Sequence, residues 1–461
     1  MKTNYISALV ANAALTAAIL LATATASAQT FTTLKNFSSA DGGIGINSGL
    51  TLSGGMLYGV GGSPANFPAG MIYKVSTNGS GFTVIHQFTG GSEGSFPAGR
   101  VVISGNTIYG VTYQGGTNFN LNNQFGGDGI IYRVSTDGSD FSVLRRLDAT
   151  AGDGYKPEFG MVLSGSTLYG TTLQGGDFDR GAVFKISTNG TGYQNIHSFD
   201  YATDGTQPQA ELTLIGNTLF GTTAFGNFAA PNGGELFKIG LDGTGFSVLY
   251  TFTNLFSVQI EAMNGLTAVG NTLYGVGLDY ATSKSSVYRI NTNGSGFQII
   301  SQLPSGSWFC GVLTWTGSEL LGTWSDELET GVIFQVKTNG TGYRVLETFG
   351  SADGSGTAID LVLAGTVLYG TARPSQLGVH TNSTGTVFSF DVRPRLAIAA
   401  AGASAKVSWP SYAYNYQLEQ SPTLASASWT NVLGAPLDDG TNQSTTFSPG
   451  PGNWLFRLHK P

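Results

Sequence analysis

Residues 163–172 read LSGSTLYGTT and begin a unit that occurs seven times along the chain. In this unit an apolar strand, a Ser-Gly turn and a Leu-Tyr-Gly strand are followed by a Gly-rich loop, the strand VFKI at 183–186, an Asn-Gly turn and a last strand at 193–199. A regular period of about 20–50 residues identifies solenoids, propellers and similar arrays. The repeat therefore decides the fold, and it says much less about chemistry.

Four strands, which we name a, b, c and d, recur in each unit. Strand a begins eight residues before the key residue of strand b, as in Leu50 and Tyr58, and strand c begins ten residues before strand d, as in Ile72 and Phe82. Such fixed short offsets predict β-hairpins, and the Asn-Gly or Asp-Gly of the c–d turn is a strong hairpin signal. The mean period, (369 − 58)/6, is about 52 residues, which is typical of propeller blades. The key residues of strand b are Tyr58, Tyr109, Tyr169, Phe220, Tyr274, Leu321 and Tyr369.

The loop between strands b and c carries most of the length variation. The offset between these strands ranges from 12 residues (333 − 321) to 22 residues (131 − 109). Connections in an antiparallel meander alternate between the two ends of the strands. The b–c and d–a loops therefore share one face, which we name the long-loop face. Because variable loops on a rigid scaffold usually carry function, this is the predicted binding face.

The two ends of the repeat region predict a closed ring. No strand d follows ten residues after Val387, whereas 31–37, FTTLKNF, has the pattern of a strand d without strands a, b and c before it. An N-terminal strand that completes the last blade removes an exposed edge. The sequence thus predicts an all-β seven-bladed β-propeller of four-stranded blades at 29–392, closed by this N-terminal strand. An open solenoid is the alternative, but it would need polar capping repeats at both ends.

Several motifs resemble a known repeat. The string GNTLYG, the Gly-Gly that follows it and the string VFKI-x-TNGTGF are similar to the GloVer (Gloeo_Verruco) tandem repeat of exported bacterial proteins, over about residues 31–390. Repeats five and six depart from this pattern at 277–278 and 320–322. The resemblance implies export and a β-propeller-like fold, and it supplies no established catalytic residues.

Residues 395–461 no longer follow the repeat. They read as short alternating strands between Gly, Pro and Ser turns. The segment resembles the fibronectin-type-III-like modules that end many exported bacterial proteins. Because it is shorter than the ~100 residues of a full sandwich, we expect a small β-sandwich.

Residues 1–28 have the pattern of a signal peptide. Lys2 supplies the positive charge, 8–21 form an apolar stretch, and Ala26-Ser27-Ala28 form a small-residue cleavage site. A transmembrane anchor is the alternative, but Thr and Ala dilute the stretch, which is shorter than the ~20 residues of a span. The sequence predicts a secreted or periplasmic protein with no membrane span after cleavage.

Composition narrows the classes of partner. Charged residues make up 11% of the chain, the net charge is −7, and no cluster of Lys and Arg occurs. Phosphate backbones require a basic face, so we expect no nucleic-acid partner. Cys310 is the only cysteine, which excludes an intrachain disulfide.

Motifs for metals and catalysis are missing from the sequence. It contains no His-x-x-x-His or other metal spacing and no Gly-x-Ser-x-Gly motif, so we expect no metal, no cofactor and no catalytic set. His86 and His197 occupy the fifth position of strand d, where the residue type varies. This variation predicts an exposed strand position, which in the other repeats carries Lys35, Arg145, Tyr250, Ser301 and Glu347.

An acidic residue followed by Gly recurs in the d–a loops. One interpretation is a calcium site or a ring of acidic ligand contacts, because hard cations prefer carboxylate oxygens. The other is a turn in which the carboxylate accepts a hydrogen bond from nearby backbone. A feature present in five repeats is more often structural, which favours the turn. The pairs are Asp41-Gly42, Glu93-Gly94, Asp153-Gly154, Asp204-Gly205 and Asp353-Gly354.

The residue before strand a gives the best candidate site. If strand d is outermost, strand a is innermost, and this residue stands where the chain enters the channel from the long-loop face. Arg100, Glu211 and Asp360 are charged there, and charges in a narrow channel cost free energy unless they are paired or used. They either order the mouth by pairing or form a polar ring for a ligand. The seven residues are Gly49, Arg100, Gly160, Glu211, Gly265, Val312 and Asp360.

Aromatic residues of the long-loop face could stack on sugar rings, and Tyr155 and Trp308 are the candidates at the rim of this mouth. The alternative for these and for Tyr113, Phe225 and Trp324 is packing within their own loops. The sequence favours non-catalytic binding of a polysaccharide or a cell-surface protein. The rivals are a polysaccharide lyase or hydrolase, which needs a close acid–base pair that the scattered carboxylates do not suggest, and a structural envelope or matrix protein.

Overall fold

The structure is a computed structural model. The predicted signal peptide and the candidate Trp308 lie outside the residues that it describes. Among the described residues no helix is both long and apolar enough to cross a membrane. The chain divides into two compact units, Thr32–Ser389 and a unit that joins Met1–Phe31 to Phe390–Pro461. The described residues are 31–459 except 39–40, 42–44, 47, 63–68, 120–125, 228–232, 253–264, 280–283, 308–310, 327, 329, 350–359, 373–384, 393–395, 402–403, 411–415, 424, 426–427, 433, 439–441 and 448–454.

The unit Thr32–Ser389 is all-β with almost no helix, and each of the first six repeats forms an antiparallel sheet in which strands a to d follow one another. Repeat one contains β3 (Thr51–Ser53), β4 (Met56–Gly62), β5 (Met71–Ser76) and β6 (Thr83–Gln87), and repeat two contains β7 (Ser95–Ser104), β8 (Thr107–Gln114), β9 (Ile130–Ser135) and β10 (Ser142–Arg146). Repeat three contains β12 (Val162–Ser164), β13 (Thr167–Thr172), β15 (Ala182–Ser187) and β16 (Gln194–Ser198), and repeat four contains β18 (Thr213–Ile215), β19 (Thr218–Phe225), β20 (Glu235–Gly240) and β21 (Ser247–Thr251). Repeat five contains β22 (Thr267–Val269), β23 (Thr272–Asp279), β24 (Lys284–Asn291) and β25 (Gln298–Ser305), repeat six contains β26 (Thr314–Trp315), β27 (Glu319–Ser325), β28 (Gly331–Lys337) and β29 (Arg344–Thr348), and repeat seven contains β30 (Val362–Ala364), β31 (Val367–Ala372) and β32 (Thr386–Asp391).

Short extra elements lie in the d–a and b–c loops. Two of them pair with each other, β11 with β14, and two extend the sheets of repeats one and four, β2 beside β4 and β17 beside β19. Two further extra elements are single turns of 3-10 helix in d–a loops. The elements are β2 (Gly45–Ile46), β11 (Gly154–Tyr155), β14 (Gln174–Gly175), β17 (Thr206–Pro208), η2 (Gly91–Glu93) and η3 (Ala149–Ala151).

The Leu-Tyr-Gly motif has a packing reason. In repeat three β13 pairs with β15 over six residues, which places Gly170 opposite Phe184. A Cβ atom on Gly170 would lie 2.6 Å from Cζ of Phe184, closer than packed atoms approach. The strand-b glycine therefore makes room for the large strand-c side chain, which is fully buried.

The missing fourth strand of repeat seven comes from the start of the chain. The last sheet has the order β1-β32-β31-β30, with β1 (Phe31–Asn36) at its edge beside β32. The N–H of Phe37 continues this pairing by donating to the carbonyl of Gly385 over 2.9 Å. The pairing predicted for 31–37 is thus present in the structure.

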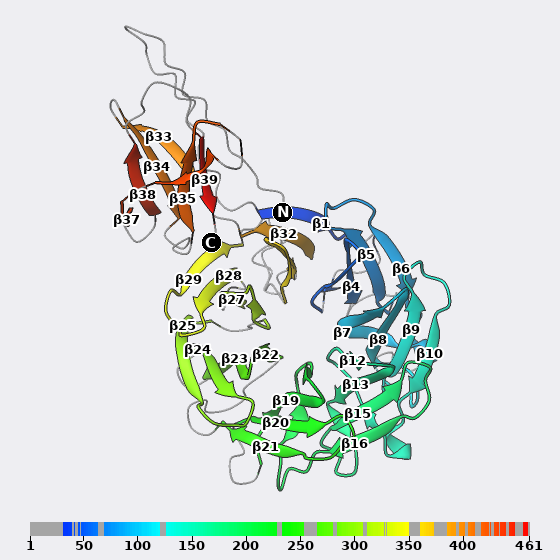
Figure 1. The fold of residues 1–461 in the computed structure, drawn as a ribbon. Coiled ribbons are helices and arrows are strands. Elements are labelled where there is room, and N and C mark those ends of the chain that lie inside the picture. Colours follow the sequence, from blue (N-terminus) through cyan, green and yellow to red (C-terminus); the bar gives the residue numbers. More distant parts are fainter. Residues whose placement is uncertain are drawn as a thin grey trace. The chain divides into compact units, whose positions relative to one another are not determined.

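The core lies between neighbouring sheets. One cluster joins Tyr109 and Val111 of repeat two to Leu168 and Phe184 of repeat three, and equivalent clusters join most other neighbours. Another joins Phe37 and residues of repeat one to residues of repeat seven. In Figure 1 β6, β10, β16, β21 and β25 lie on the outside of this unit, while β12 and β22 lie toward its centre. Strand a is thus the inner strand and strand d the outer one.

The C-terminal unit contains two small antiparallel sheets, with the orders β33-β34-β38-β37 and β36-β35-β39. Val407 and Trp409 of the first sheet share a buried cluster with Leu418 and Phe456 of the second. The two sheets therefore pack on each other. Their strands are β33 (Ala397–Ala401), β34 (Ser404–Pro410), β35 (Gln417–Ser421), β36 (Thr430–Asn431), β37 (Leu437–Asp438), β38 (Asn442–Phe447) and β39 (Leu455–His459).

Candidate functional site

The residues that precede strand a lie close together although they come from separate repeats. We name these seven residues, defined above, the inner cluster. A Cβ atom on Gly49 would lie 2.6 Å from Cβ of Asp360 and 3.2 Å from Nη2 of Arg100. A Cβ atom on Gly160 would lie 3.1 Å from Cδ of Glu211. The three charged side chains thus lie over the neighbouring glycines, where any larger residue would displace them.

Arg100 and Asp360 form a loose ion pair. Their Nη2 and Oδ2 atoms are 3.4 Å apart, and both side chains are partly buried, with 26% and 15% of their surface exposed. Asp360 also accepts a hydrogen bond from the N–H of Val312 through Oδ1, over 2.9 Å. Burial opposes the charged form of Arg100, but the carboxylates of Glu211 and Asp360 outweigh it and raise the pKa of the guanidinium.

Glu211 is the charged member of the inner cluster that interacts with Arg100 through its charge but without a direct contact. Its carboxylate has no hydrogen bond or ion pair with any residue that the structure describes. Burial raises the pKa of Glu211 to about 7; Arg100 lowers it and Asp360 raises it further. This carboxyl group therefore lies near a guanidinium whose Nε atom has no hydrogen-bond partner among the described residues. Such a pair can accept one hydrogen bond and donate another to a ligand.

The two predicted stacking residues have different outcomes. Trp308 lies outside the described residues. Tyr155 lies in β11, where its ring packs against the cluster of Tyr109 and Leu168. Its hydroxyl donates to Oδ1 of Asp179 over 3.0 Å, and burial, followed by the bond to Asp179, raises its pKa to about 12. Tyr155 is thus half-buried and tied to a neighbouring loop.

The other aromatic residues of the long-loop face are also held locally. Lys156 Nζ lies 5.8 Å from the ring centre of Tyr113. The indole N–H of Trp324 donates to the hydroxyl of Tyr343 over 3.2 Å, and Phe225 is half-buried at the end of β19. All three residues lie near the ends of strands, in β8, β19 and β27, and not within the loops as the alternative interpretation expected.

The expected exposure of the fifth position of strand d is wrong. His86 stacks on Phe141 with ring centres 3.8 Å apart, and His197 stacks on Phe246 at 3.6 Å. In each case the fifth residue of one repeat's strand d is covered by the first residue of strand d in the next repeat. The same stacking accommodates five of the seven residues because each has an aromatic or a cationic group, which Ser301 and Glu347 lack. The further pairs are Lys35 on Phe82, Arg145 on Tyr193 and Tyr250 on Phe297.

The acidic residues of the d–a loops pair with these same side chains. Lys35 Nζ lies 2.9 Å from Oδ2 of Asp41, and His197 Nε2 lies 2.6 Å from Oδ2 of Asp204. Each carboxylate also accepts a backbone N–H of its own turn, that of Ser38 for Asp41 and that of Asp200 for Asp204. Within the described chain no group of three or more His, Cys, Asp and Glu residues is placed to hold a metal. The backbone hydrogen bonds agree with the turn interpretation, whereas the side-chain pairs with Lys35 and His197 were not predicted. Glu93 instead accepts the hydroxyl of Thr89, and Asp353 lies outside the described residues.

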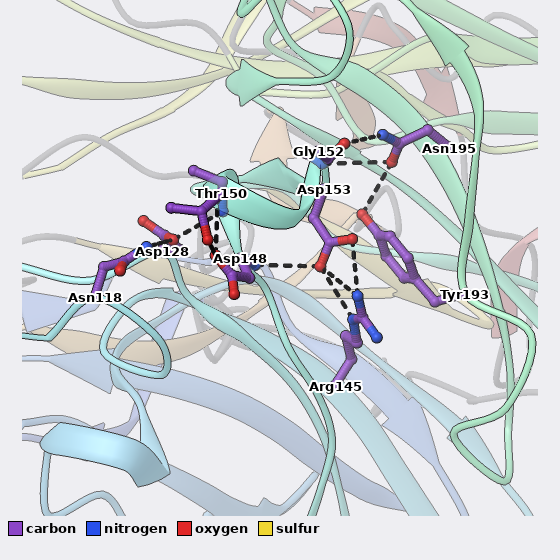
Figure 2. A network of polar contacts seen from close by, with 11 residues as sticks. Asn118, Asp128, Arg145, Asp148, Thr150, Gly152, Asp153, Tyr193 and Asn195 are labelled. Atoms are coloured by element: carbon purple, nitrogen blue, oxygen red, sulfur yellow. Dashed lines mark hydrogen bonds and ion pairs between the residues drawn. The ribbon is translucent and has the colours of Figure 1, made fainter.

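The pair in repeat two has the densest surroundings (Figure 2). Arg145 donates two hydrogen bonds to Asp153 from Nη2, at 2.9 and 2.7 Å, and a third from Nε at 3.1 Å. Asp153 Oδ2 also accepts the N–H of Asp148, and Asn195 Nδ2 donates to the carbonyl of Gly152. We name this group, with Tyr193, the outer network. It fixes the d–a loop that leads into β11.

The sequence pattern missed one buried acid. Glu235, the first residue of β20, is fully buried, and its Oε2 atom has no hydrogen-bond partner among the described residues. Burial raises its pKa to about 7. An alignment of the repeats would have found it, because every equivalent residue is uncharged. These residues are Met71, Ile130, Ala182, Ser286, Val332 and Thr386.

Comparisons with known proteins support the repeat and the fold. Residues 120–327 match the model of the Gloeobacter/Verrucomicrobia repeat, whereas no curated protein sequence matches the chain. An oligogalacturonate lyase in complex with manganese is 11% identical, with 74% of this chain and 86% of the lyase covered and a TM-score of 0.50. A puromycin-hydrolysing peptidase of Mycobacterium tuberculosis is 12% identical, with a TM-score of 0.50 and 79% of this chain covered. This chain spans only 58% of that peptidase. At such identities the likeness shows a β-propeller-like scaffold and nothing about activity.

Proposed function

The chain belongs to the Gloeobacter/Verrucomicrobia repeat family, and from this premise we propose that its repeats form a closed seven-bladed β-propeller that binds a ligand. Three observations support closure. β1 pairs with β32, a buried cluster joins repeats one and seven, and the hydroxyl of Thr371 donates to the carbonyl of Ser48 over 3.1 Å. The closed ring would leave the long-loop face as the variable surface.

The proposed binding site is the inner cluster, and its ligand is a glycan or a protein partner at the cell surface. The observation that carries this proposal is the convergence of Arg100, Glu211 and Asp360 from three separate repeats, with Glu211 left unpaired. An unpaired, partly buried carboxylate costs free energy. A ligand that donates a hydrogen bond to it, and accepts one from Arg100, recovers that cost. Hydroxyl groups do both.

The setting of this function is proposed on the sequence. Residues 1–28 would direct export, so the ligand would be met in the periplasm or outside the cell. The two packed sheets of the C-terminal unit would be a small fibronectin-type-III-like sandwich. Tyr155 and Trp308 remain the proposed rim residues, with Tyr155 supporting its loop through Asp179.

Binding can be tested with soluble polysaccharides by affinity electrophoresis. We expect Arg100→Ala and Glu211→Gln to weaken retention at least about tenfold, a loss of roughly 1.4 kcal/mol, without lowering the melting temperature. The control is Arg133→Ala, because Arg133 is exposed on strand c and bonds only Ser142 among the described residues. Unchanged binding by the triple variant of Arg100, Glu211 and Asp360 would contradict the proposed site. A wild-type protein that binds no glycan or surface protein would instead favour the structural envelope role.

An enzyme is the second candidate, and one observation favours it. The pKa of Glu211 is raised to about 7 in a site that also contains Asp360. An acid poised near neutral pH next to a second carboxylate is the arrangement that glycosidic cleavage uses. Release of reducing ends or unsaturated products from the same polysaccharides, lost in Glu211→Gln, would establish catalysis. Retention without product release supports simple binding.

A further inference from the structure

One aromatic side chain of the long-loop face is exposed instead of packed. Phe178 lies in the turn at 176–181 between β14 and β15, and 53% of its surface is accessible to solvent. Exposed aromatic rings of this size lose the hydrophobic stabilisation that burial gives. Single exposed apolar residues are common on protein surfaces, so the case for a role of Phe178 depends on the turn that carries it.

The turn that carries Phe178 is fixed by hydrogen bonds on both sides of the ring. Asp179 has a left-handed backbone, with φ 55°, which costs free energy for a residue other than Gly. Its Oδ1 atom accepts the N–H of Gly175 over 3.1 Å and the hydroxyl of Tyr155 over 3.0 Å. The N–H groups of Arg180 and Gly181 both donate to the carbonyl of Gly175, at 3.1 and 3.0 Å. Phe178 is thus held out on a defined turn.

The base of this turn is anchored to two further loops. β14 pairs with β11, and β11 directly follows Asp153 of the outer network (Figure 2). On the other side, the N–H of Gln207 in repeat four donates to the carbonyl of Arg180 over 2.9 Å. The hydrogen bonds that hold this turn come from three d–a and b–c loops. Because the turn is already held in place, a ligand that binds the ring of Phe178 loses little affinity to the cost of ordering the loop.

The surroundings of Phe178 point to the class of ligand. Asp177, Asp179 and Arg180 are all exposed, so the ring is flanked by hydrogen-bonding groups and not by other apolar side chains. The other large exposed hydrophobic residues among those described lie in different repeats or in the C-terminal unit. A protein interface needs a contiguous apolar centre, which is missing here. An exposed flat ring whose neighbours in the sequence are charged and exposed suits a pyranose, which has an apolar face and hydroxyl groups around its rim.

We infer that Phe178 is the stacking surface of a carbohydrate subsite, in which Asp177 and Arg180 bond the hydroxyl groups of one sugar unit of a glycan. This subsite is separate from the inner cluster, although it rests on the proposed function in assuming a glycan as ligand. It also reassigns the role of Tyr155, which positions the turn through Asp179. The sugar would stack on the neighbouring Phe178.

The test uses affinity electrophoresis of the full chain in gels with xylan, laminarin, galactomannan or polygalacturonate. We expect at least one polysaccharide to retain the wild-type protein, Phe178→Ala to lose at least tenfold in affinity, and Phe178→Trp to keep it. The tryptophan of Phe178→Trp should also change its fluorescence when the polysaccharide is added. The matched control is Leu328→Ala, because Leu328 is a still more exposed apolar residue, in the b–c loop of repeat six.

The outcomes separate this subsite from the inner cluster. Loss of retention in Phe178→Ala but not in Arg100→Ala supports the subsite and contradicts the inner cluster. Loss in Arg100→Ala alone, with no fluorescence change in Phe178→Trp, overturns the subsite and leaves the inner cluster standing. Absence of retention on all four polysaccharides, or an equal loss in Leu328→Ala, also overturns the subsite.

Discussion

The charges of the outer network and those of the inner cluster are arranged in opposite ways. Arg145 and Asp153 share three hydrogen bonds of 2.7–3.1 Å, and Asp153 accepts a further backbone N–H. Arg100 and Asp360 make a single contact of 3.4 Å, and Glu211 has no partner among the described residues. Both groups are partly buried, so burial alone does not explain the difference.

The difference separates charged groups that stabilise the fold from charged groups that remain available to bind a ligand. A buried charge is tolerated when its hydrogen bonds are satisfied and is costly when they are not. The outer network meets this condition within the protein, and the pattern recurs in Lys35 with Asp41 and in His197 with Asp204. The inner cluster does not meet it, and nothing like Glu211 occurs in the equivalent positions of neighbouring repeats, which carry Gly160 and Gly265.

The comparison predicts its largest effect in the outer network. Asp153→Ala should destabilise the protein by about 2–3 kcal/mol, because it leaves the guanidinium of Arg145 and the N–H of Asp148 without their acceptor. Chemical denaturation would measure this loss. Asp177→Ala is the control, since Asp177 is exposed and its removal should change stability by less than about 0.5 kcal/mol. Equal effects of the two substitutions would mean that the outer network is not structural.

Most of the fold could be predicted from the sequence because it repeats. Seven strand-b motifs of the Leu-Tyr-Gly type and six Asn-Gly or Asp-Gly turns give strand positions, hairpins and loop lengths. The incomplete last repeat predicts the pairing of β1 with β32. The same argument failed for the fifth position of strand d. Variation in residue type suggests exposure, but His86 and His197 are covered by Phe141 and Phe246 of the next repeat.

The candidate site was predictable only in part. Register placed Arg100, Glu211 and Asp360 at equivalent points of three repeats, and geometry brings them together. Register alone could not show that Asp360 would pair with Arg100 while Glu211 remained alone. Nor could it distinguish Tyr155, whose hydroxyl donates to Asp179, from the exposed Phe178 next to Asp179 in the sequence. Side-chain exposure depends on the contacts between loops of different repeats. These contacts do not recur from repeat to repeat, so the repeat pattern does not predict them.

A second, smaller effect is expected at Glu235. Burial raises its pKa to about 7 from 4.5, so the folded protein keeps a proton that the unfolded chain has lost. The stability from this group is present below about pH 4.5 and is lost as the pH rises through 7. Glu235→Ile, which copies Ile130 of repeat two, should therefore stabilise the protein by about 1–2 kcal/mol at pH 8 and much less at pH 5. Denaturation at both pH values measures it. A variant that is less stable at pH 8 would show that the hydrogen bond from the hydroxyl of Thr251 to Oε1 of Glu235, over 3.5 Å, outweighs the cost of the buried charge.

The smallest effect on stability is expected at Glu211, and it is the sharpest test of the comparison. The pKa of Glu211 is also raised to about 7, chiefly by burial, so its contribution has the same sign as that of Glu235. Its side chain is partly exposed, and solvent screening keeps the effect small. Glu211→Gln should therefore leave stability at pH 8 unchanged or raise it by less than about 1 kcal/mol.

Glu211→Gln keeps the size of the side chain but removes its charge, and so separates binding from folding. In the outer network the matching change, Asp153→Asn, should still lower stability because Arg145 loses its counter-ion. In the inner cluster the same chemistry should lower only the affinity for the polysaccharide. Melting curves and polysaccharide retention, measured on Glu211→Gln and Asp153→Asn in parallel, show whether each carboxylate contributes to stability or to binding. If Glu211→Gln destabilises the protein as much as Asp153→Asn does, Glu211 holds the fold together and the inner cluster is no freer to bind a ligand than the outer network.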